Sequence, residues 1–517
     1  MNSAWKTRVY RSDGMAAASA RARTLAWLSL ALVVTASLFW SVHPWYDPTN
    51  DGSMYIATAR ALVAGEGYRY LGIPFVIRPP GFSLLIAPVL ALRGTDFFAL
   101  NLLVSLLGAL GVIAFHFLLR ARLGLVLATL VPLLLWFNPG YQRLCNQVMS
   151  DVPGWAALVG CLLLAARQHG RAGVARALAL RVGLGVALGL ATLLRSGNLL
   201  LLPALVLAEL LRALPGARAR ASWRAGLGNS AARVLGVLLV LVPWGLRNRA
   251  VAAPPPADQT LLYSYSTGMW HTDMGDPRSS RVPLREVLGR ASEQGQKILH
   301  TLGTGLTEGE KRPWTAPLAW TLLAVLLVQA VRRRAAEELF ALATVAVVAV
   351  YFGYAGRLLV PVFAFALAAL VELVRDLLAR LAGERRATGA AALACCAGLA
   401  LEWNPRAGWG EIEGLHRAYT DSARQVNAHL SPGARLGAYR GWHHAVFLER
   451  PVYSCEQACE RARDPRAAEE IIDRYGLDTV LLTELGLPPS VQLAERAFAA
   501  YVAQRHGGRE RGLVRVR

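Results

Sequence analysis

The sequence has little charge for its length. Of its 517 residues only 17% are Asp, Glu, Lys or Arg, whereas 54% are hydrophobic and the mean hydropathy is +0.36. This balance excludes an ordinary soluble protein of this size and is typical of a chain that crosses a membrane several times.

Acidic residues are particularly scarce, since 34 Asp and Glu stand against 55 Lys and Arg, and the formal net charge is +21. A basic chain can bind nucleic acid when its cations share one soluble face. Here most cations lie in short segments between apolar runs, where the positive-inside rule accounts for them. We therefore expect no nucleic-acid partner.

Metal-binding patterns are also lacking. Four of the six cysteines lie in apolar runs or stand alone in a loop. Cys455 and Cys459 could form a disulfide in an oxidising compartment, but structural or free thiols are the favoured interpretation. The carboxy-terminal segment contains no P-loop, no GxGxxG after a strand and no zinc-ligand spacing. We interpret His443 and His444 in this segment as surface or packing residues.

Long apolar runs dominate what is present. A membrane span needs roughly 20 apolar residues, fewer when the helix is short or broken, and about eleven runs are candidates. The candidate spans cover residues 25–42, 97–119, 123–137, 152–166, 177–194, 197–210, 234–246, 314–331, 337–353, 358–374 and 388–402.

The basic segments set the expected orientation. An apolar run from 182 to 210 is interrupted at residues 195–198 and could form one span or two. Two spans keep Arg218, Arg220 and Arg224 on the same side as the other basic loops, which the positive-inside rule makes cytoplasmic. We therefore prefer two spans, with a cytoplasmic amino terminus.

These patterns predict a polytopic α-helical membrane protein with a small carboxy-terminal α/β domain outside the membrane. Within the tail, the patterns ARLGAY, AAEEIIDRYG and LDTVLLT predict a strand, a helix and a strand. The expected parts are a basic cytoplasmic segment at 1–24, a membrane domain at 25–402 with outer loops 43–96 and 247–313, and an extracytoplasmic domain at 403–517.

The first outer loop holds an acid at an expected helix start. Asp51 follows the cap and turn residues 47–50, and the helix should run through Tyr55, Ala59 and Leu62. A carboxylate in the first helical turn stays ionised because the helix dipole favours negative charge. Asp51 could simply stabilise the helix start, or it could be a base at the membrane surface.

Arg78 precedes two prolines in the same loop. Pro79 and Pro80 hold the backbone extended and so fix the direction of the arginine side chain. The planar guanidinium suits phosphate, although an interfacial arginine can also extend to the membrane surface without a ligand. Its place beside Asp51 favours a functional role.

Other polar residues are expected at the outer ends of spans. Asp151 precedes Pro153 and could be a helix cap, but acids at the edge of an apolar bundle are functional candidates. Arg195, Arg247 and Arg357 end spans on the side opposite the basic loops. Their position calls for an anionic ligand or partner.

The order of these motifs resembles the GT-C superfamily, nearest to protein O-mannosyltransferases, aminoarabinose lipid A transferases and bacterial transferases of lipopolysaccharide sugars. The resemblance covers about residues 25 to 400 and hardly extends into the tail. The segments that carry it are Asp51 with Tyr55, ALVAGEGY, Arg78-Pro79-Pro80-Gly81, Ser150-Asp151-Val152-Pro153, PWGLRN at 243–248, and Arg357 near Pro361.

The resemblance implies specific roles. Asp51 matches the acid that acts near the acceptor as general base, and Asp151 matches the second acidic position. Relatives often have Glu after the first acid, where this chain has Gly52. Arg78 stands where relatives often have Lys or His near the donor phosphate.

The remaining site residues follow from the same likeness. Arg247 and Arg357 are the further expected phosphate ligands. Tyr55, which belongs to the same motif as Asp51, is the expected substrate-binding residue.

The expected activity is transfer of a sugar, with inversion, from a polyprenyl-phosphate donor to a lipid, glycan or protein acceptor at the outer face of the bacterial inner membrane. No cofactor is required, although the two carboxylates could weakly bind a divalent cation. A flippase for lipid-linked sugars is the alternative, although no internal repeat favours such a carrier. A membrane scaffold leaves Arg78 and its two prolines unexplained.

Overall fold

The computed structural model describes most of the chain. The described residues are 20–168, 174–213, 219–251, 269–272, 279–307, 309–351, 356–402, 406, 408–431, 433–482, 489–507 and 513–516. Most of the expected amino-terminal segment 1–24 and much of the expected loop 247–313 therefore lie outside the described residues.

Helices make up nearly all of the chain up to residue 402. In order, this part contains α2 (Ala20–Ser41), α3 (Asn50–Val63), β1 (Arg69–Tyr70), β2 (Ile73–Pro74), α4 (Gly81–Arg93), α5 (Phe97–Phe137), α6 (Pro139–Cys145), α7 (Asp151–Arg167), α8 (Val174–Leu194), η3 (Ser196–Leu200), α9 (Leu201–Ala213), α10 (Ala219–Val251), α13 (Leu284–Gly303), α14 (Thr315–Arg333), α15 (Ala336–Val350), η4 (Gly356–Leu359), α16 (Val360–Ala382) and α17 (Glu384–Glu402).

Six helices in the described part of the chain are long and apolar enough to cross a membrane. They lie at Ala22–Ser41, Phe97–Phe137, Ala175–Leu194, Gly228–Val251, Thr315–Arg333 and Gly356–Ala382. The other expected spans coincide with helices that are shorter or less apolar, such as α9 with 13 residues and α15 with 15. The protein is therefore a multi-pass membrane protein, and about eleven spans stay a prediction.

Two of the expected breaks between neighbouring apolar runs are present in the structure. The long helix α5 contains one residue with non-helical dihedral angles, Gly124, whose φ of 72° is readily adopted only by glycine. This break agrees with the expected boundary between 97–119 and 123–137. Between α8 and α9, the chain forms the short turn η3, so the run from 182 to 210 is two helices.

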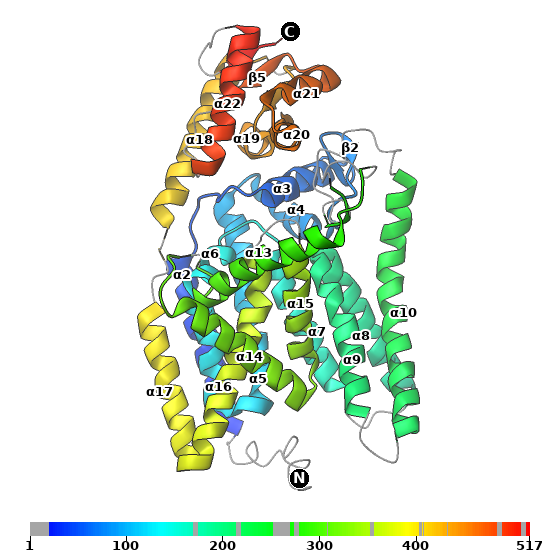
Figure 1. Ribbon diagram of the computed structural model, residues 1–517, viewed down its shortest axis with the longest axis vertical. Coiled ribbons are helices and arrows are strands. Elements are labelled where there is room, and N and C mark those ends of the chain that lie inside the picture. The colour runs from blue at the N-terminus through cyan, green and yellow to red at the C-terminus, as the bar shows by residue number, and fades with distance from the viewer. Residues whose placement is uncertain are drawn as a thin grey trace.

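Apolar packing joins the helices of the bundle into one core. The rings of Phe115 on α5, Trp155 on α7 and Phe365 on α16 lie 5.3 to 5.8 Å apart between centroids. In Figure 1, α3 and α13 cross one end of this bundle, and the carboxy-terminal segment lies beyond α3. We call this the α3 end.

The carboxy-terminal segment contains a small mixed sheet with flanking helices. Its elements are α18 (Trp409–His429), β3 (Leu436–Ala438), α19 (Gly441–Leu448), β4 (Val452–Ser454), α20 (Glu456–Ala462), η5 (Pro465–Ala467), α21 (Ala468–Tyr475), β5 (Thr479–Leu481), α22 (Pro489–His506) and β6 (Leu513–Arg515). The strand order is β4-β3-β5-β6, with β6 antiparallel to β5 and the other pairs parallel. The expected strand, helix and strand are β3, α21 and β5.

Residues singled out in this segment have packing roles. Cys455 and Cys459 are both buried free thiols, as expected. His443 and His444 are each only 2% exposed. The Nδ1 atom of His443 lies 3.3 Å from the hydroxyl oxygen of Tyr419. These histidines are core residues.

Polar contacts fix this segment to α3. The guanidinium of Arg60 donates to the carbonyl oxygens of Ala445 and Val446, at 3.0 and 2.8 Å, near the carboxyl end of α19. Trp442 packs in a cluster with Met54 and Phe75. The helix that carries Asp51 is thus covered by the carboxy-terminal segment.

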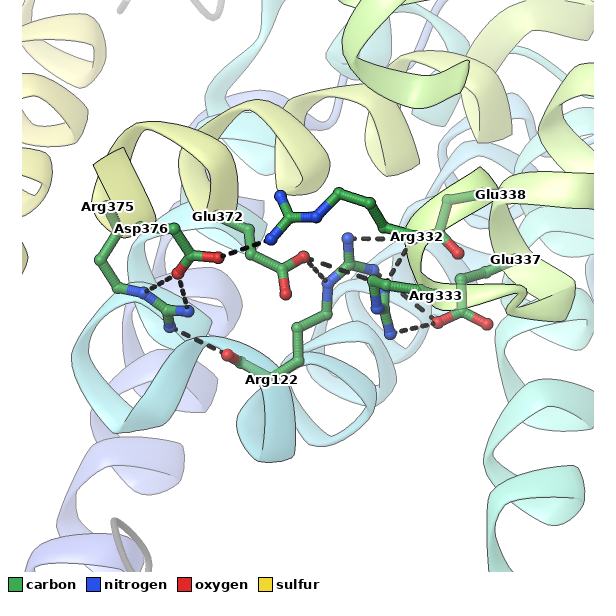
Figure 2. Close-up of polar contacts among 8 residues, drawn as sticks. All are labelled: Arg122, Arg332, Arg333, Glu337, Glu338, Glu372, Arg375 and Asp376. Carbon is green, nitrogen blue, oxygen red and sulfur yellow. Dashed lines mark hydrogen bonds and ion pairs between the residues drawn. The ribbon is translucent and has the colours of Figure 1, made fainter. Parts of the chain in front are cut away.

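A network of ion pairs lies at the other end of the bundle (Figure 2). Arg122 on α5 reaches Glu372 on α16 at 2.8 Å and Glu338 on α15 at 3.0 Å. Arg375 donates to the carbonyl oxygen of Arg122 at 2.9 Å. The network has no formal net charge because its arginines and acids are equal in number: Arg122, Arg332, Arg333, Arg375, Glu337, Glu338, Glu372 and Asp376.

We expect Arg122→Gln to destabilise the protein strongly, because the buried Glu338 would keep only Arg333 of its two arginines and the network would hold one acid more than it has arginines. Removing one partner of a buried ion pair costs about 3–5 kcal/mol. The measurement is the thermal transition of the purified protein in detergent. Arg332→Gln is the control, since Arg332 is 31% exposed and lies 3.6 Å from Asp376. Equal shifts for the two variants would contradict this account.

Candidate active site

The site begins at the amino terminus of α3. Thr49 caps this helix, and its hydroxyl accepts a hydrogen bond of 3.1 Å from the backbone N–H of Gly52. Asp51 lies in the first turn, and the helix runs to Val63. The helix expected from the cap and turn residues is confirmed, and it places the Asp51 carboxylate within reach of Arg78 and Arg357.

Gly52 has no room for a side chain. A Cβ atom there would lie 2.5 Å from the Thr49 hydroxyl and 2.8 Å from the backbone oxygen of Val148. A glutamate at this position would therefore require the segment before α7 to move. The packing around Gly52 therefore has no room for the second carboxylate that the GT-C resemblance implied at this position.

Arg78 contacts one oxygen of Asp51. Its Nε and Nη2 atoms lie 3.3 and 3.2 Å from Oδ1, and the residue is only 5% exposed. The Tyr68 hydroxyl lies 3.2 Å from the carbonyl oxygens of Arg78 and Pro79. At Gly81 the start of α4 approaches the end of α8, where an added Cβ would lie 2.5 Å from the Leu193 oxygen. The backbone around Arg78 is therefore well fixed.

Arg357 contacts the other oxygen of Asp51. Its Nη2 atom lies 2.6 Å from Oδ2, and its Nε atom lies 3.4 Å from Oδ1 of Asp151. Because η4 carries Arg357 just before α16, the guanidinium reaches two acids from a third part of the chain. It bridges the two expected catalytic carboxylates.

A third arginine completes the cluster. Arg195, at the end of α8, lies 2.8 Å from Oδ1 of Asp151, whose side chain is 1% exposed. Its aliphatic stem packs closely against Gly154. Sequence reasoning placed Arg195 on the outer side but did not assign it to the site. Its only signal was a cation in the interruption between two apolar runs.

We call these five residues the arginine–aspartate cluster: Asp51, Arg78, Asp151, Arg195 and Arg357. Three guanidiniums face two carboxylates, so the cluster has a formal charge of one positive unit when all are ionised. Such a surplus attracts an anion, and guanidiniums match the oxygens of phosphate.

Tyr55 lies at the edge of this cluster. Its hydroxyl is 3.2 Å from Ser150 Oγ, immediately before Asp151, and its ring meets Phe82 edge-on. In the structure Tyr55 joins α3 to the start of α7 and to α4. Its substrate contact stays a prediction.

Arg247 lies in a different environment. Its Nη1 and Nη2 atoms donate to the carbonyl oxygens of Phe75 and Tyr68, at 2.6 and 2.9 Å. The guanidinium also lies over the Trp244 ring, 5.0 Å from its centroid. These contacts hold the segment that leads to Arg78, and the phosphate contact expected of Arg247 stays a prediction.

The charge state of Asp51 follows from its neighbours. Burial opposes its ionisation, but the guanidiniums of Arg78 and Arg357 outweigh this effect and hold the pKa of the Asp51 carboxyl below its ordinary value. In this state Asp51 is an ionised and weakly basic group.

Comparison with solved structures identifies the fold. ArnT from Cupriavidus metallidurans bound to undecaprenyl phosphate matches with a TM-score of 0.62 and 16% identity, over 96% of this chain and 98% of that chain. The chain has the GT-C fold. The apo state of the same ArnT matches with a TM-score of 0.59 and 17% identity, over 96% of this chain and 98% of that chain.

A second GT-C protein is also similar. The oligosaccharyltransferase AglB from Archaeoglobus fulgidus, in complex with an inhibitory peptide and a dolichol-phosphate, has a TM-score of 0.50 and 14% identity. The match covers 89% of this chain and 69% of that chain. No family model and no curated protein sequence matches the chain. The GT-C resemblance expected from the order of motifs therefore holds at the level of the fold.

The ion pairs of Asp51 should make stability depend on pH. Because the pKa of Asp51 in the folded protein is below the unfolded value of about 3.9, ionised Asp51 stabilises the fold above that pH. This stabilisation is lost as the pH falls through the lowered pKa.

We therefore expect Asp51→Asn to lower the thermal transition at neutral pH, and the difference from wild type to shrink below about pH 4. Asp96→Asn is the matched control, because Asp96 caps α5 and Asn is an equally good cap. A difference for Asp51→Asn that stays constant across the acid range would contradict the assignment.

Proposed function

We propose that this protein is a membrane glycosyltransferase that transfers a sugar from a polyprenyl-phosphate donor to an envelope acceptor. The observation that carries the proposal is the arginine–aspartate cluster, which lies at the α3 end of a GT-C fold. A surplus of guanidinium charge beside two carboxylates suits a reaction with a phosphate leaving group and a proton to remove.

The printed descriptions of the similar proteins support this donor class. ArnT has been solved with undecaprenyl phosphate and AglB with a dolichol-phosphate, and both ligands are phosphates on a polyprenyl chain. A long apolar chain can remain in the bilayer while its phosphate reaches a polar cluster at the end of the bundle. The proposal does not specify which sugar the donor carries.

In the proposed reaction, Asp51 accepts the proton of the acceptor hydroxyl. This step requires a distance of about 2.6–3.2 Å between the carboxylate and hydroxyl oxygens. Direct attack of that hydroxyl on the anomeric carbon inverts its configuration. Arg78 and Arg357 stabilise the phosphate oxygen that gains charge as the glycosidic bond breaks.

No metal enters the proposed mechanism. Asp51 and Asp151 are already contacted by Arg78, Arg195 and Arg357, and the positive surplus opposes binding of a divalent cation. Among the described residues, no group of three or more His, Cys, Asp or Glu side chains could hold a metal ion.

The proposed location is the outer face of the bacterial inner membrane. It rests on the positive-inside pattern, which places the basic loops in the cytoplasm and the α3 end outside. The acceptor in this setting is a glycan, lipid or protein of the cell envelope.

We expect purified protein in lipid nanodiscs to transfer label from a member of a panel of radiolabelled polyprenyl-phosphate sugars to an envelope extract. Asp51→Asn should lower kcat by roughly 10²–10⁴-fold, the usual contribution of a positioned base. Asp96→Asn is the control, since this acid lies in the same segment and keeps its capping role as Asn.

Full activity of Asp51→Asn would remove Asp51 as the base. In proteoliposomes, movement of the lipid-linked sugar across the membrane without transfer would overturn the proposal and identify a flippase.

A further inference from the structure

The contacts of Asp51 raise a chemical difficulty for a base. Its Oδ1 atom is held by Arg78 and its Oδ2 atom by Arg357, so both oxygens of the carboxylate face positive charge. Such a carboxylate has little affinity for a proton. In this arrangement Asp51 is ionised, but it is too weak a base to take a proton from the acceptor.

The same two arginines are those proposed to bind the donor phosphate. A guanidinium carries five N–H donors, so it can contact two anions at once. The positive charge, however, is divided between those anions. As negative charge grows on the phosphate, less of the attraction of each arginine remains for Asp51.

The charges of the donor phosphate and of Asp51 change in opposite directions during transfer. The donor phosphodiester carries one negative charge, and its product, a phosphate monoester, gains up to one more. Over the same step Asp51 loses its negative charge by accepting a proton. The total charge of the cluster with its ligand is therefore unchanged.

We propose that Arg78 and Arg357 are shared between Asp51 and the donor phosphate, and that charge building on the departing phosphate releases Asp51 to take the acceptor proton. This inference rests on the proposed function. The bond from the acceptor oxygen to the anomeric carbon forms, the bond from that carbon to the phosphate oxygen breaks, and its electron pair stays on the phosphate. The proton moves from the acceptor hydroxyl to Asp51.

Arg357 is the arginine best placed to change partners. Its side chain is 31% exposed, whereas the side chain of Arg78 is 6% exposed and precedes two prolines. Its Nη2 end faces Asp51 and its Nε edge faces Asp151. Arg357 can therefore turn its Nη2 end toward a phosphate while Asp151 retains its Nε edge.

Arg195 holds Asp151 in the position from which it contacts the Nε atom of Arg357. It lies 2.8 Å from Asp151, at the amino-terminal end of α7. Asp151 is buried and is paired with Arg195 on this side, and its Oδ1 atom also contacts the Nε atom of Arg357, so it anchors Arg357 throughout. Arg195 and Asp151 are therefore positioning residues, while Asp51 is the group that exchanges a proton.

The test measures protons taken up when the product lipid binds. Undecaprenyl phosphate is titrated into the protein in nanodiscs at about pH 5, above the ordinary pKa of an aspartic acid. Isothermal calorimetry in buffers of different ionisation enthalpy gives the number of protons exchanged. The lipid phosphate, with a second pKa of about 6, also exchanges protons on binding, so its protonation in each complex is measured from its ³¹P chemical shift and subtracted. The remaining difference between variants reports on Asp51.

We expect wild type and Asp96→Asn to take up more protons per bound lipid than Asp51→Asn, by a substantial fraction of one proton. Arg357→Gln should bind the lipid more weakly and lose most of this difference. Undecaprenol, which lacks the phosphate, should cause no uptake linked to Asp51.

Equal uptake by wild type and Asp51→Asn, with both binding the lipid, would overturn the sharing of arginines and leave the proposed function intact. Failure of wild type to prefer undecaprenyl phosphate over undecaprenol would overturn both.

Infrared difference spectra of wild type provide a test without any variant. A band of a protonated carboxyl group should appear with the phosphate lipid and not with undecaprenol, and its absence would contradict the inference.

Discussion

The ion pairs of Asp51 with Arg78 and Arg357 are the contacts on which the candidate site depends. They join residues 27 and 306 positions apart in the chain. Local structure fixes two of these residues. The Thr49 cap of α3 positions Asp51, and the two prolines before α4 position Arg78. Helices α7 and α8 add Asp151 and Arg195, so the site is complete only when the bundle is folded.

The two charged clusters described at the opposite ends of the bundle differ in composition, and the difference indicates their roles. At the end opposite α3, four arginines and four acids balance, and the deepest of them fix α5, α15 and α16 to one another. At the α3 end, three arginines face two acids. A balanced buried network needs no further ion, whereas an unbalanced one favours an anionic ligand.

Much of the fold was predictable because membrane helices are encoded locally. Apolar length gives the spans, glycine and polar residues mark their breaks at Gly124 and near Arg195, and turn residues give the start of α3. The number of spans was less certain because helices such as α9 and α15 are too short to decide by length.

The sequence predicted most residues of the candidate site, but it did not predict which of them form ion pairs with each other. Asp51, Arg78, Asp151 and Arg357 were all singled out, and the structure brings them together. The partner of a guanidinium depends on contacts across the whole bundle, which no local pattern contains. For this reason sequence reasoning did not assign Arg195 to the site and placed Arg247 with the phosphate ligands, although its described contacts are with the segment before Arg78.

The central claim is that the phosphate of the donor lies between Arg78 and Arg357, beside Asp51. An experimental structure of the protein with undecaprenyl phosphate tests it most directly. In that structure, phosphate oxygens should lie within hydrogen-bond distance of both guanidiniums, and Arg357 should lie farther from Asp51. A phosphate bound elsewhere, with both arginines still paired to the acids, would contradict it.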